Sequence, residues 1–196
     1  MKLITRSPRR LIMAAAVAGA AILLPAVALA SSAGSDSATS ATQPHAVAYR
    51  HCARSSLTSW IGLPGGATAG STYYELEISN LSRHTCTLYG FPGVSALGAG
   101  GRQLGSAAAR TYGFPIETVT LQPLATAHVL LQITDVGNYS PSACHPTTAD
   151  ALRVYAPGDY ASMKFPFTFP ACGRKGPVYL HVNPTLAGTG IPGYSN

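Results

Sequence analysis

The sequence predicts an all-β protein: an antiparallel, immunoglobulin-like β-sandwich of about seven or eight strands with two disulfides. Three observations lead to this prediction. Short segments alternate apolar with polar residues, Gly- and Pro-rich turns separate those segments, and four cysteines are spread along the chain. Alternation with a period of two is typical of half-buried strands. No segment shows the helical period that the crossovers of a parallel sheet would need.

Eight segments fit the strand pattern. In the clearest, residues 73–78, apolar side chains alternate with a tyrosine and two glutamates. The eight segments are 73–78, 85–89, 94–97, 118–121, 127–134, 152–155, 162–167 and 178–182. Turn residues punctuate the chain between them, at 63–66, 91–93, 98–101, 122–123, 135–138 and 156–159. We also expect one short helix near residues 147–151, capped by Thr147 or Thr148.

The first 30 residues have the layout of a signal peptide. Basic residues within the first ten are followed by an almost uncharged run from Leu11 to Ala30. Small side chains at Ala28 and Ala30 predict cleavage after Ala30. The adjacent Arg9 and Arg10 leave the general secretory route and the twin-arginine route both open. We therefore expect a secreted, extracellular protein with no transmembrane segment in the mature chain.

The composition of the mature chain argues against nucleic-acid binding. Four of the thirteen Lys and Arg residues lie in the leader, and the nine that remain exceed the seven Asp and Glu residues by only two. Such binding needs basic side chains clustered on one face. We expect residues 31–48, rich in Ser, Ala and Thr, to form a flexible linker. Residues 49–184 should form the β-sandwich, and residues 185–196 an irregular tail.

The cysteines indicate disulfides and not a metal site. Their even number fits an oxidising compartment, and no Cys-x-x-Cys pair is present. Four cysteines allow three pairings, which the sequence leaves open. We favour Cys52 with Cys86 and Cys144 with Cys172, because these pairs close short loops that do not overlap. Each loop of about 30 residues would contribute roughly 3 to 4 kcal/mol.

Polar side chains on the strands suggest chemistry that we set aside. Glu75 and Glu77 lie on one face of a strand, roughly 7 Å apart, which is a separation that inverting glycosidases use. We expect both to be exposed and to solvate the sheet. His128 and His181 occupy outward strand positions that could meet across strands, but a third metal ligand is missing. We predict no catalytic residue, no metal and no cofactor.

Aromatic residues in loops are the strongest indication of a binding surface. Four lie in segments bounded by Gly or Pro, where a ring offers contact area at a low cost in entropy: Tyr112, Phe114, Tyr139 and Tyr160. These are our candidate ligand-contact residues, although rings can also simply cover the ends of a sandwich. We expect Trp60, by contrast, to pack in the core beside a disulfide.

Several phrases of the sequence together resemble the secreted actinobacterial domain of unknown function 4232. The phrases are GSTYY at 70–74, ISN at 78–80, TCTLYGFPGV at 85–94, GRQLG at 101–105, VTLQP at 119–123, DVGNY at 135–139 and LRVY at 152–155. The resemblance covers about residues 52–182. It implies an extracellular or cell-envelope sandwich, often a lipoprotein, with no assigned activity. This chain departs from it by lacking an acylated cysteine and by having Leu124 where a turn glycine is expected.

The function that we expect is a noncatalytic binding or interaction domain. Its partner would be an extracellular protein or glycan, and the chain is expected to be a monomer. A secreted protease inhibitor is the first alternative, with residues 140–145 as its disulfide-braced loop. A hydrolase with an unfamiliar site is the second alternative.

Overall fold

The computed structural model describes residues 48–189. The predicted signal peptide, residues 1–30, lies outside the described residues, as do all of the predicted linker except residue 48 and the last part of the tail, residues 190–196. Within the described part, no helix is long and apolar enough to cross a membrane.

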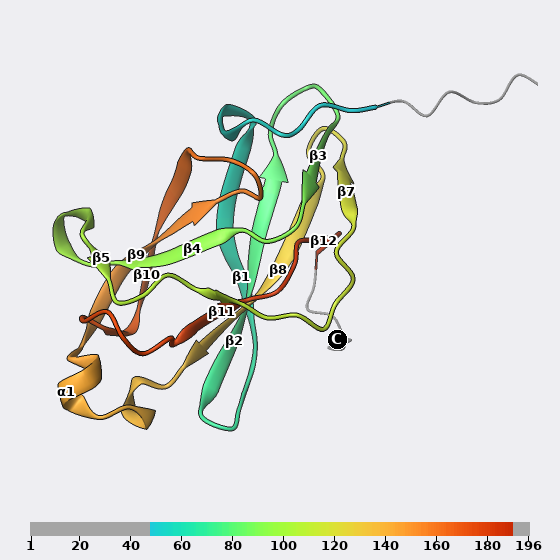
Figure 1. The fold of residues 1–196 in the computed structure, drawn as a ribbon. Coiled ribbons are helices and arrows are strands. Elements are labelled where there is room, and N and C mark those ends of the chain that lie inside the picture. Colours follow the sequence, from blue (N-terminus) through green and yellow to red (C-terminus); the bar gives the residue numbers. More distant parts are fainter. Residues whose placement is uncertain (1–47, 190–196) are drawn as a thin grey trace, which may run out of the picture. The chain divides into compact units, whose positions relative to one another are not determined.

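The described residues form an all-β structure in which two main sheets face each other (Figure 1). The first sheet has the strand order β1-β2-β8-β11-β6, and the short β12 also pairs with β8. Its strands are β1 (Leu57–Thr68), β2 (Ser71–Asn80), β8 (Thr126–Thr134), β11 (Leu180–Val182), β6 (Ala109–Arg110) and β12 (Leu186–Ala187). All of these pairs are antiparallel except β11 with β6, which is parallel and departs from the purely antiparallel prediction.

The second sheet has the order β10-β9-β4-β5, and a separate two-stranded sheet joins β3 to β7. These strands are β10 (Ser162–Cys172), β9 (Pro146–Tyr155), β4 (Gly93–Leu97), β5 (Gln103–Leu104), β3 (Cys86–Tyr89) and β7 (Thr118–Leu121). Within residues 48–189, helical structure is limited to α1 (Pro141–Cys144) and three 3₁₀ turns, at Arg54–Ser56, Ala99–Gly101 and Val136–Asn138.

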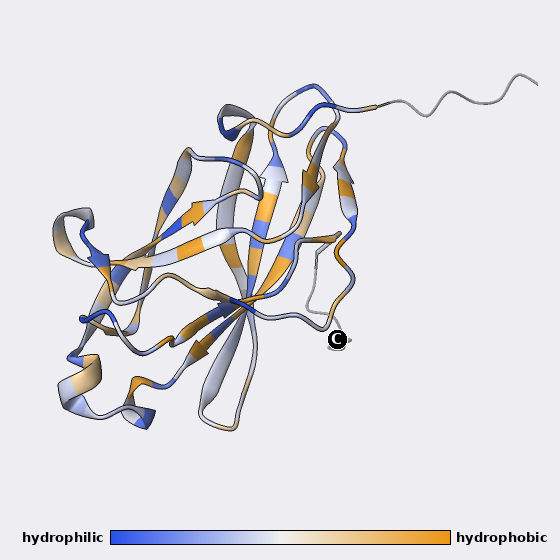
Figure 2. Cartoon of the chain, viewed as in Figure 1, coloured by the Kyte–Doolittle hydropathy of each residue, from blue (hydrophilic) through white to orange (hydrophobic). Residues whose placement is uncertain are grey.

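The period-two patterns place apolar side chains between the sheets, as predicted. Leu76 and Ile78 of β2 are fully buried, as is Val129 of β8. They belong to one hydrophobic cluster with Leu152 and Val154 of β9. Apolar positions alternate along these strands in Figure 2. Burial of this continuous apolar layer drives the sheets together.

Each of the eight predicted segments contains a strand, but β1 was missed because its Pro64-Gly65-Gly66 sequence predicts a turn. The strand accommodates this sequence through register shifts against β2 between Ile61 and Pro64 and between Pro64 and Gly66. The helix predicted at 147–151 was wrong. These residues lie in β9, where alternating burial and pairing with β10 override the capping signal.

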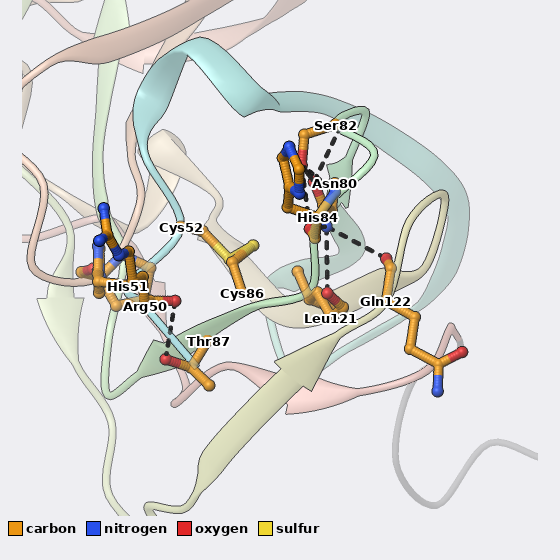
Figure 3. The surroundings of a disulfide bond; sticks show 11 residues. Arg50, His51, Cys52, Asn80, Ser82, His84, Cys86, Thr87, Leu121 and Gln122 are labelled. Atoms are coloured by element: carbon orange, nitrogen blue, oxygen red, sulfur yellow. Dashed lines mark hydrogen bonds between the residues drawn. A yellow bond between two sulfur atoms is a disulfide. The ribbon is translucent and has the colours of Figure 1, made fainter. Parts of the chain in front are cut away.

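The disulfides join Cys52 to Cys86 and Cys144 to Cys172, which is the favoured pairing. The first disulfide fixes the start of the domain to β3. The bonded pair is shown in Figure 3, and the backbone amide of Cys52 also donates to Thr87 O at 2.9 Å. The second joins α1 to the end of β10. Both cysteine pairs therefore tie irregular segments to the sheets.

A fully buried asparagine, Asn80, lies near the first disulfide (Figure 3). Its amide nitrogen donates to the backbone oxygens of His84, Leu121 and Gln122 at 2.8, 3.1 and 3.2 Å. Its side-chain oxygen accepts from the Ser82 amide at 3.0 Å and from the Ser82 hydroxyl at 2.7 Å. Asn80 thus joins the end of β2 to the end of β7, and its own buried amide group is fully hydrogen-bonded.

Candidate functional site

The four predicted contact residues lie in different environments. Tyr112 and Tyr160 are exposed, with 68% and 96% of their surface accessible. Tyr139 packs against the core and donates its hydroxyl to Val178 O at 2.9 Å, so it closes an end of the sandwich. Phe114 is half-buried. Among these four residues, the exposed aromatic area is therefore concentrated at Tyr112 and Tyr160.

Tyr112 lines a surface depression of about 290 Å³. We call this region the Tyr112 surface, and its lining residues are Tyr89, Gly90, Phe91, Arg110, Tyr112, Ile116 and Gly158. Tyr89 is 61% exposed and Ile116 38%. The rings of Phe91 and Tyr112 meet edge to face, with centroids 5.1 Å apart. This arrangement is favourable for aromatic pairs and holds both rings in place.

Arg110 adds a cation to the Tyr112 surface. Its guanidinium carbon lies 5.4 Å from the centroid of the Phe91 ring, within the range of a cation–π contact. The Arg110 side chain is exposed. No hydrogen bond or ion pair to another described residue occupies its guanidinium. Its donors are therefore available to a ligand.

Segments far apart in the sequence build the Tyr112 surface. Tyr89 ends β3 and pairs with Thr118 at the start of β7, which brings the 111–117 loop beside the β3–β4 turn. The turn reverses at Gly90, whose φ of +94° favours glycine. Gly158 belongs to the β9–β10 loop, which His51 reaches with a 2.6 Å contact from Nε2 to Pro157 O.

Of the Tyr112 surface, sequence reasoning found only Tyr112. Tyr89 was assigned to a strand, and Arg110 is an isolated residue without a motif. Phe91 stands beside Pro92, so its place in a turn was a usable signal. The convergence of the three loops follows from strand pairing, which a single sequence does not specify.

The expectation for Glu75 and Glu77 was wrong. Glu77 is only 3% exposed, and Glu75 is half-buried. Burial raises the pKa of Glu77 to about 8, and a hydrogen bond to the Glu75 side chain and repulsion by the Glu75 charge add to this effect. The two carboxyl groups therefore share a proton at hydrogen-bonding distance, which leaves no room between them for the water of an inverting glycosidase.

Trp60 and His128 flank Glu77 in the register of β1 and β8, and both were misplaced by sequence reasoning. Trp60 is 40% exposed and not in the core, because it shares the outer face of the sheet with Glu77. His128 is buried, and its Nδ1 donates to Gly188 O at 2.9 Å. The short β12 pairs with β8 at His128.

The two strand histidines do not meet. His181 is opposite Gln132, whereas His128 is opposite Leu186. His181 is half-buried, and burial lowers its pKa. In the part of the chain that the structure describes, no three His, Cys, Asp or Glu side chains are arranged to hold a metal ion.

The loop proposed for protease inhibition is not an extended strip. Residues Pro141–Cys144 form the single helical turn α1, and His145 ends it in the left-handed conformation, with φ at +50°. An inhibitor of this kind presents an extended segment to the protease, which adds it to a sheet edge. The geometry of α1 therefore does not favour this alternative.

Comparisons with curated proteins and with solved structures gave no match. One family model does match, over residues 52–185, and its description is a domain of unknown function. The matched region runs from the first cysteine past β11, so it includes both disulfides and the Tyr112 surface. The chain therefore belongs to the DUF4232 family.

Proposed function

We propose that this protein is a secreted, noncatalytic binding domain whose ligand contacts the Tyr112 surface. One observation supports this most directly. Exposed tyrosines and an arginine that has no hydrogen bond or ion pair within residues 48–189 surround a hollow of about 290 Å³ on the β scaffold. Tyr and Arg are the residues most enriched among those that dominate binding energy at interfaces.

The physical basis of the proposed binding is the free energy gained when a ligand covers the exposed side chains of this surface. The Tyr89 and Tyr112 rings have large apolar faces that gain free energy when a ligand covers them. Their hydroxyls and the Arg110 guanidinium can hydrogen-bond to the ligand at the same time. Because the Phe91 ring already holds Arg110 and Tyr112, little side-chain entropy is lost on binding.

Secretion is part of this proposal and is supported by the cysteines. Both cysteine pairs are oxidised and no free cysteine occurs in the described residues. Such bonds persist outside the reducing cytosol. The ligand is accordingly expected among extracellular or envelope proteins and glycans. Peptide groups and sugar rings can both stack on tyrosine.

A noncatalytic role is supported by the state of the carboxyl pair. Glu77 is shielded from solvent on the outer face of the first sheet, and the Tyr112 surface contains no carboxylate. General acid–base chemistry needs a titrating group within reach of the substrate. We therefore place binding, and not hydrolysis, at the Tyr112 surface.

The test is capture of ligands from envelope extract and culture supernatant, followed by affinity measurement with purified ligand. Tyr112→Ala and Arg110→Ala are each expected to weaken binding at least about tenfold, as central interface residues do. Leu124→Ala is the matched control, because Leu124 is 77% exposed and lies in the β7–β8 turn. Absence of any saturable ligand, or equal affinity of all variants, would refute the assignment.

A further inference from the structure

A second pocket lies at the end of the sandwich that the β1–β2 hairpin covers. Its volume is about 510 Å³, within the range of small-molecule sites. The hairpin tip at 67–72 forms one wall, and Phe169 and Pro170 of β10 form the other. The pocket therefore opens between the two sheets and shares no residue with the Tyr112 surface.

Two aromatic residues that line this pocket, Tyr74 and Phe169, are both packed against the Phe167 ring. Tyr74 meets Phe167 edge to face at 5.0 Å, and Phe167 packs on Phe169 at 5.2 Å. The β9–β10 register shifts between Pro166 and Phe169, and the β1–β2 register shifts on either side of the Pro64–Tyr74 pair. Such irregularities redirect side chains from the regular alternation, and they are frequent beside binding sites.

Hydrogen bonds hold the hairpin tip over the pocket. The Asp135 amide and the Asn138 side-chain amide donate to Gly70 O at 2.8 and 3.1 Å. Gly70 has φ at +73°, and a Cβ there would lie 2.7 Å from the Asn138 amide nitrogen. The tip is therefore fixed in one position without a ligand, so the pocket is preformed.

The polar side chains around the pocket are hydroxyls and one carboxylate, so the pocket lining carries one negative charge. Among the residues that line the pocket, the ionisable side chains are Asp135 and Tyr74, and no Lys, Arg or His is present. One Asp135 oxygen accepts from the Gly137 amide at 2.9 Å. The other has no hydrogen bond within the described part of the chain, so it can accept from a ligand. Threonine hydroxyls complete the rim, from Thr68, Thr72 and Thr134.

We propose that this pocket binds a small organic amine, with its apolar body against Tyr74 and Ile133 and its ammonium group at Asp135. A cation gains from the carboxylate and from the face of an aromatic ring, whereas an anion meets the Asp135 charge with no cation to offset it. The apolar body covers the part of the Tyr74 ring that is still exposed and packs against Ile133 and Val136, which are already buried.

The test compares three probes of similar size that differ in charge: phenethylamine, 2-phenylethanol and 3-phenylpropionate. Each is titrated into the isotope-labelled protein at low salt, and NMR shifts of the Ile133 and Val136 methyl groups are followed. Phenethylamine is expected to bind about tenfold more tightly than 3-phenylpropionate, as two charges near 4 Å at a wet surface predict.

Two aspartate variants isolate the charge. Asp135→Asn keeps the oxygen that accepts from the Gly137 amide, and it should reduce the preference for the amine to less than about twofold. Asp159→Asn is the control, because Asp159 also accepts a backbone amide, that of Ala161 at 2.9 Å, but lies outside the pocket. It should leave the preference unchanged.

Thr68→Trp tests the location, since a large side chain at this exposed rim position should block all three probes. The assignment is overturned if no probe binds saturably, or if the amine and the carboxylate bind equally well. It is also overturned if the preference for the amine survives Asp135→Asn. These outcomes do not depend on whether Tyr112→Ala weakens ligand binding at the Tyr112 surface, so the two proposals can fail separately.

Discussion

Replacing Glu77 by glutamine should remove a strong pH dependence of the folding stability. Glu77 is buried between Trp60 and His128 on the outer face of the first sheet and shares a proton with Glu75. Its pKa is raised from 4.5 to about 8 in the folded protein. The folded state therefore retains a proton that the unfolded chain releases above pH 4.5, and stability falls as the pH rises.

The size of the effect follows from these two pKa values. Below pH 4.5 both states are protonated at Glu77, and the group does not affect stability. By linkage, about 3 kcal/mol of unfolding free energy is lost between pH 4 and pH 7, and roughly 1 kcal/mol more by pH 9. Above pH 8 the loss levels off, because the folded carboxyl has then ionised as well.

The assay is urea unfolding at several pH values, followed by the emission of Trp60, the single tryptophan of the chain. Glutamine matches the shape of the protonated glutamate, so Glu77→Gln should equal the wild type near pH 4 and exceed it by about 3 kcal/mol at pH 7. Glu117→Gln, at an exposed carboxyl, is the control and should follow the wild type.

Other groups also titrate over this pH range, so the effect of Glu77 is read from the difference in unfolding free energy between Glu77→Gln and the wild type. Burial lowers the pKa of His181, so its protonation in acid favours the unfolded state and gives a slope of opposite sign. This contribution is present in both proteins and cancels in their difference. If the difference between Glu77→Gln and the wild type stays constant from pH 4 to pH 9, the proton-sharing account of Glu77 and Glu75 is refuted.

Three further changes test the fold by urea midpoint and slope. Leu124→Gly should raise the unfolding free energy by about 1 kcal/mol, because Leu124 has φ at +64° and is 77% exposed. Alanine has the same difficulty as leucine at positive φ, so an equal gain in Leu124→Ala would contradict the explanation by backbone strain. Asn80→Asp should lower it by about 3 kcal/mol, because the donor that three carbonyls share is lost, whereas Ser82→Ala should cost only about 1 kcal/mol. Replacing Cys52 and Cys86 together by serine should cost roughly 3 to 4 kcal/mol, and an unchanged midpoint would show that this disulfide does not restrict the unfolded chain.

The sequence predicted those parts of the fold that depend on local periodicity. Alternation in β2 and β8 identified the strands and their inner faces, because a half-buried strand needs only one apolar side chain in two. The same reasoning misassigned the outer face. It treated Glu77 as solvated and His128 as pointing outward, whereas Trp60, β12 and the Gly188 carbonyl lie beside them. These neighbours are distant in sequence, and alternation carries no information about them.

The two-residue strands were also invisible for a physical reason. β5, β6 and β12 are too short to display a period, and each is defined by the strand it pairs with. Arg110 reaches the Tyr112 surface because β6 lies beside β11 in parallel. A residue placed by such a pair has no local signal, and Arg110 was therefore absent from the prediction.

The phrases that identify the family mainly hold the sandwich together. Asn80 of the ISN phrase bridges β2 and β7, and Asn138 of DVGNY holds the hairpin at Gly70. Gly105 of GRQLG has φ at +61°, and a Cβ there would lie 2.7 Å from a backbone oxygen of Cys172, so no other residue fits.

Arg110, Tyr112 and Ile116, by contrast, lie outside all of these phrases. Tyr89 and Phe91, which line the same surface, lie inside one phrase, so the resemblance covers only part of the Tyr112 surface and does not fix its ligand. Proteins that share the phrases but differ in the 110–117 segment should therefore share the fold and bind different ligands. Exchange of this segment between two such members should transfer binding specificity while leaving the urea midpoint within the small range typical of surface substitutions.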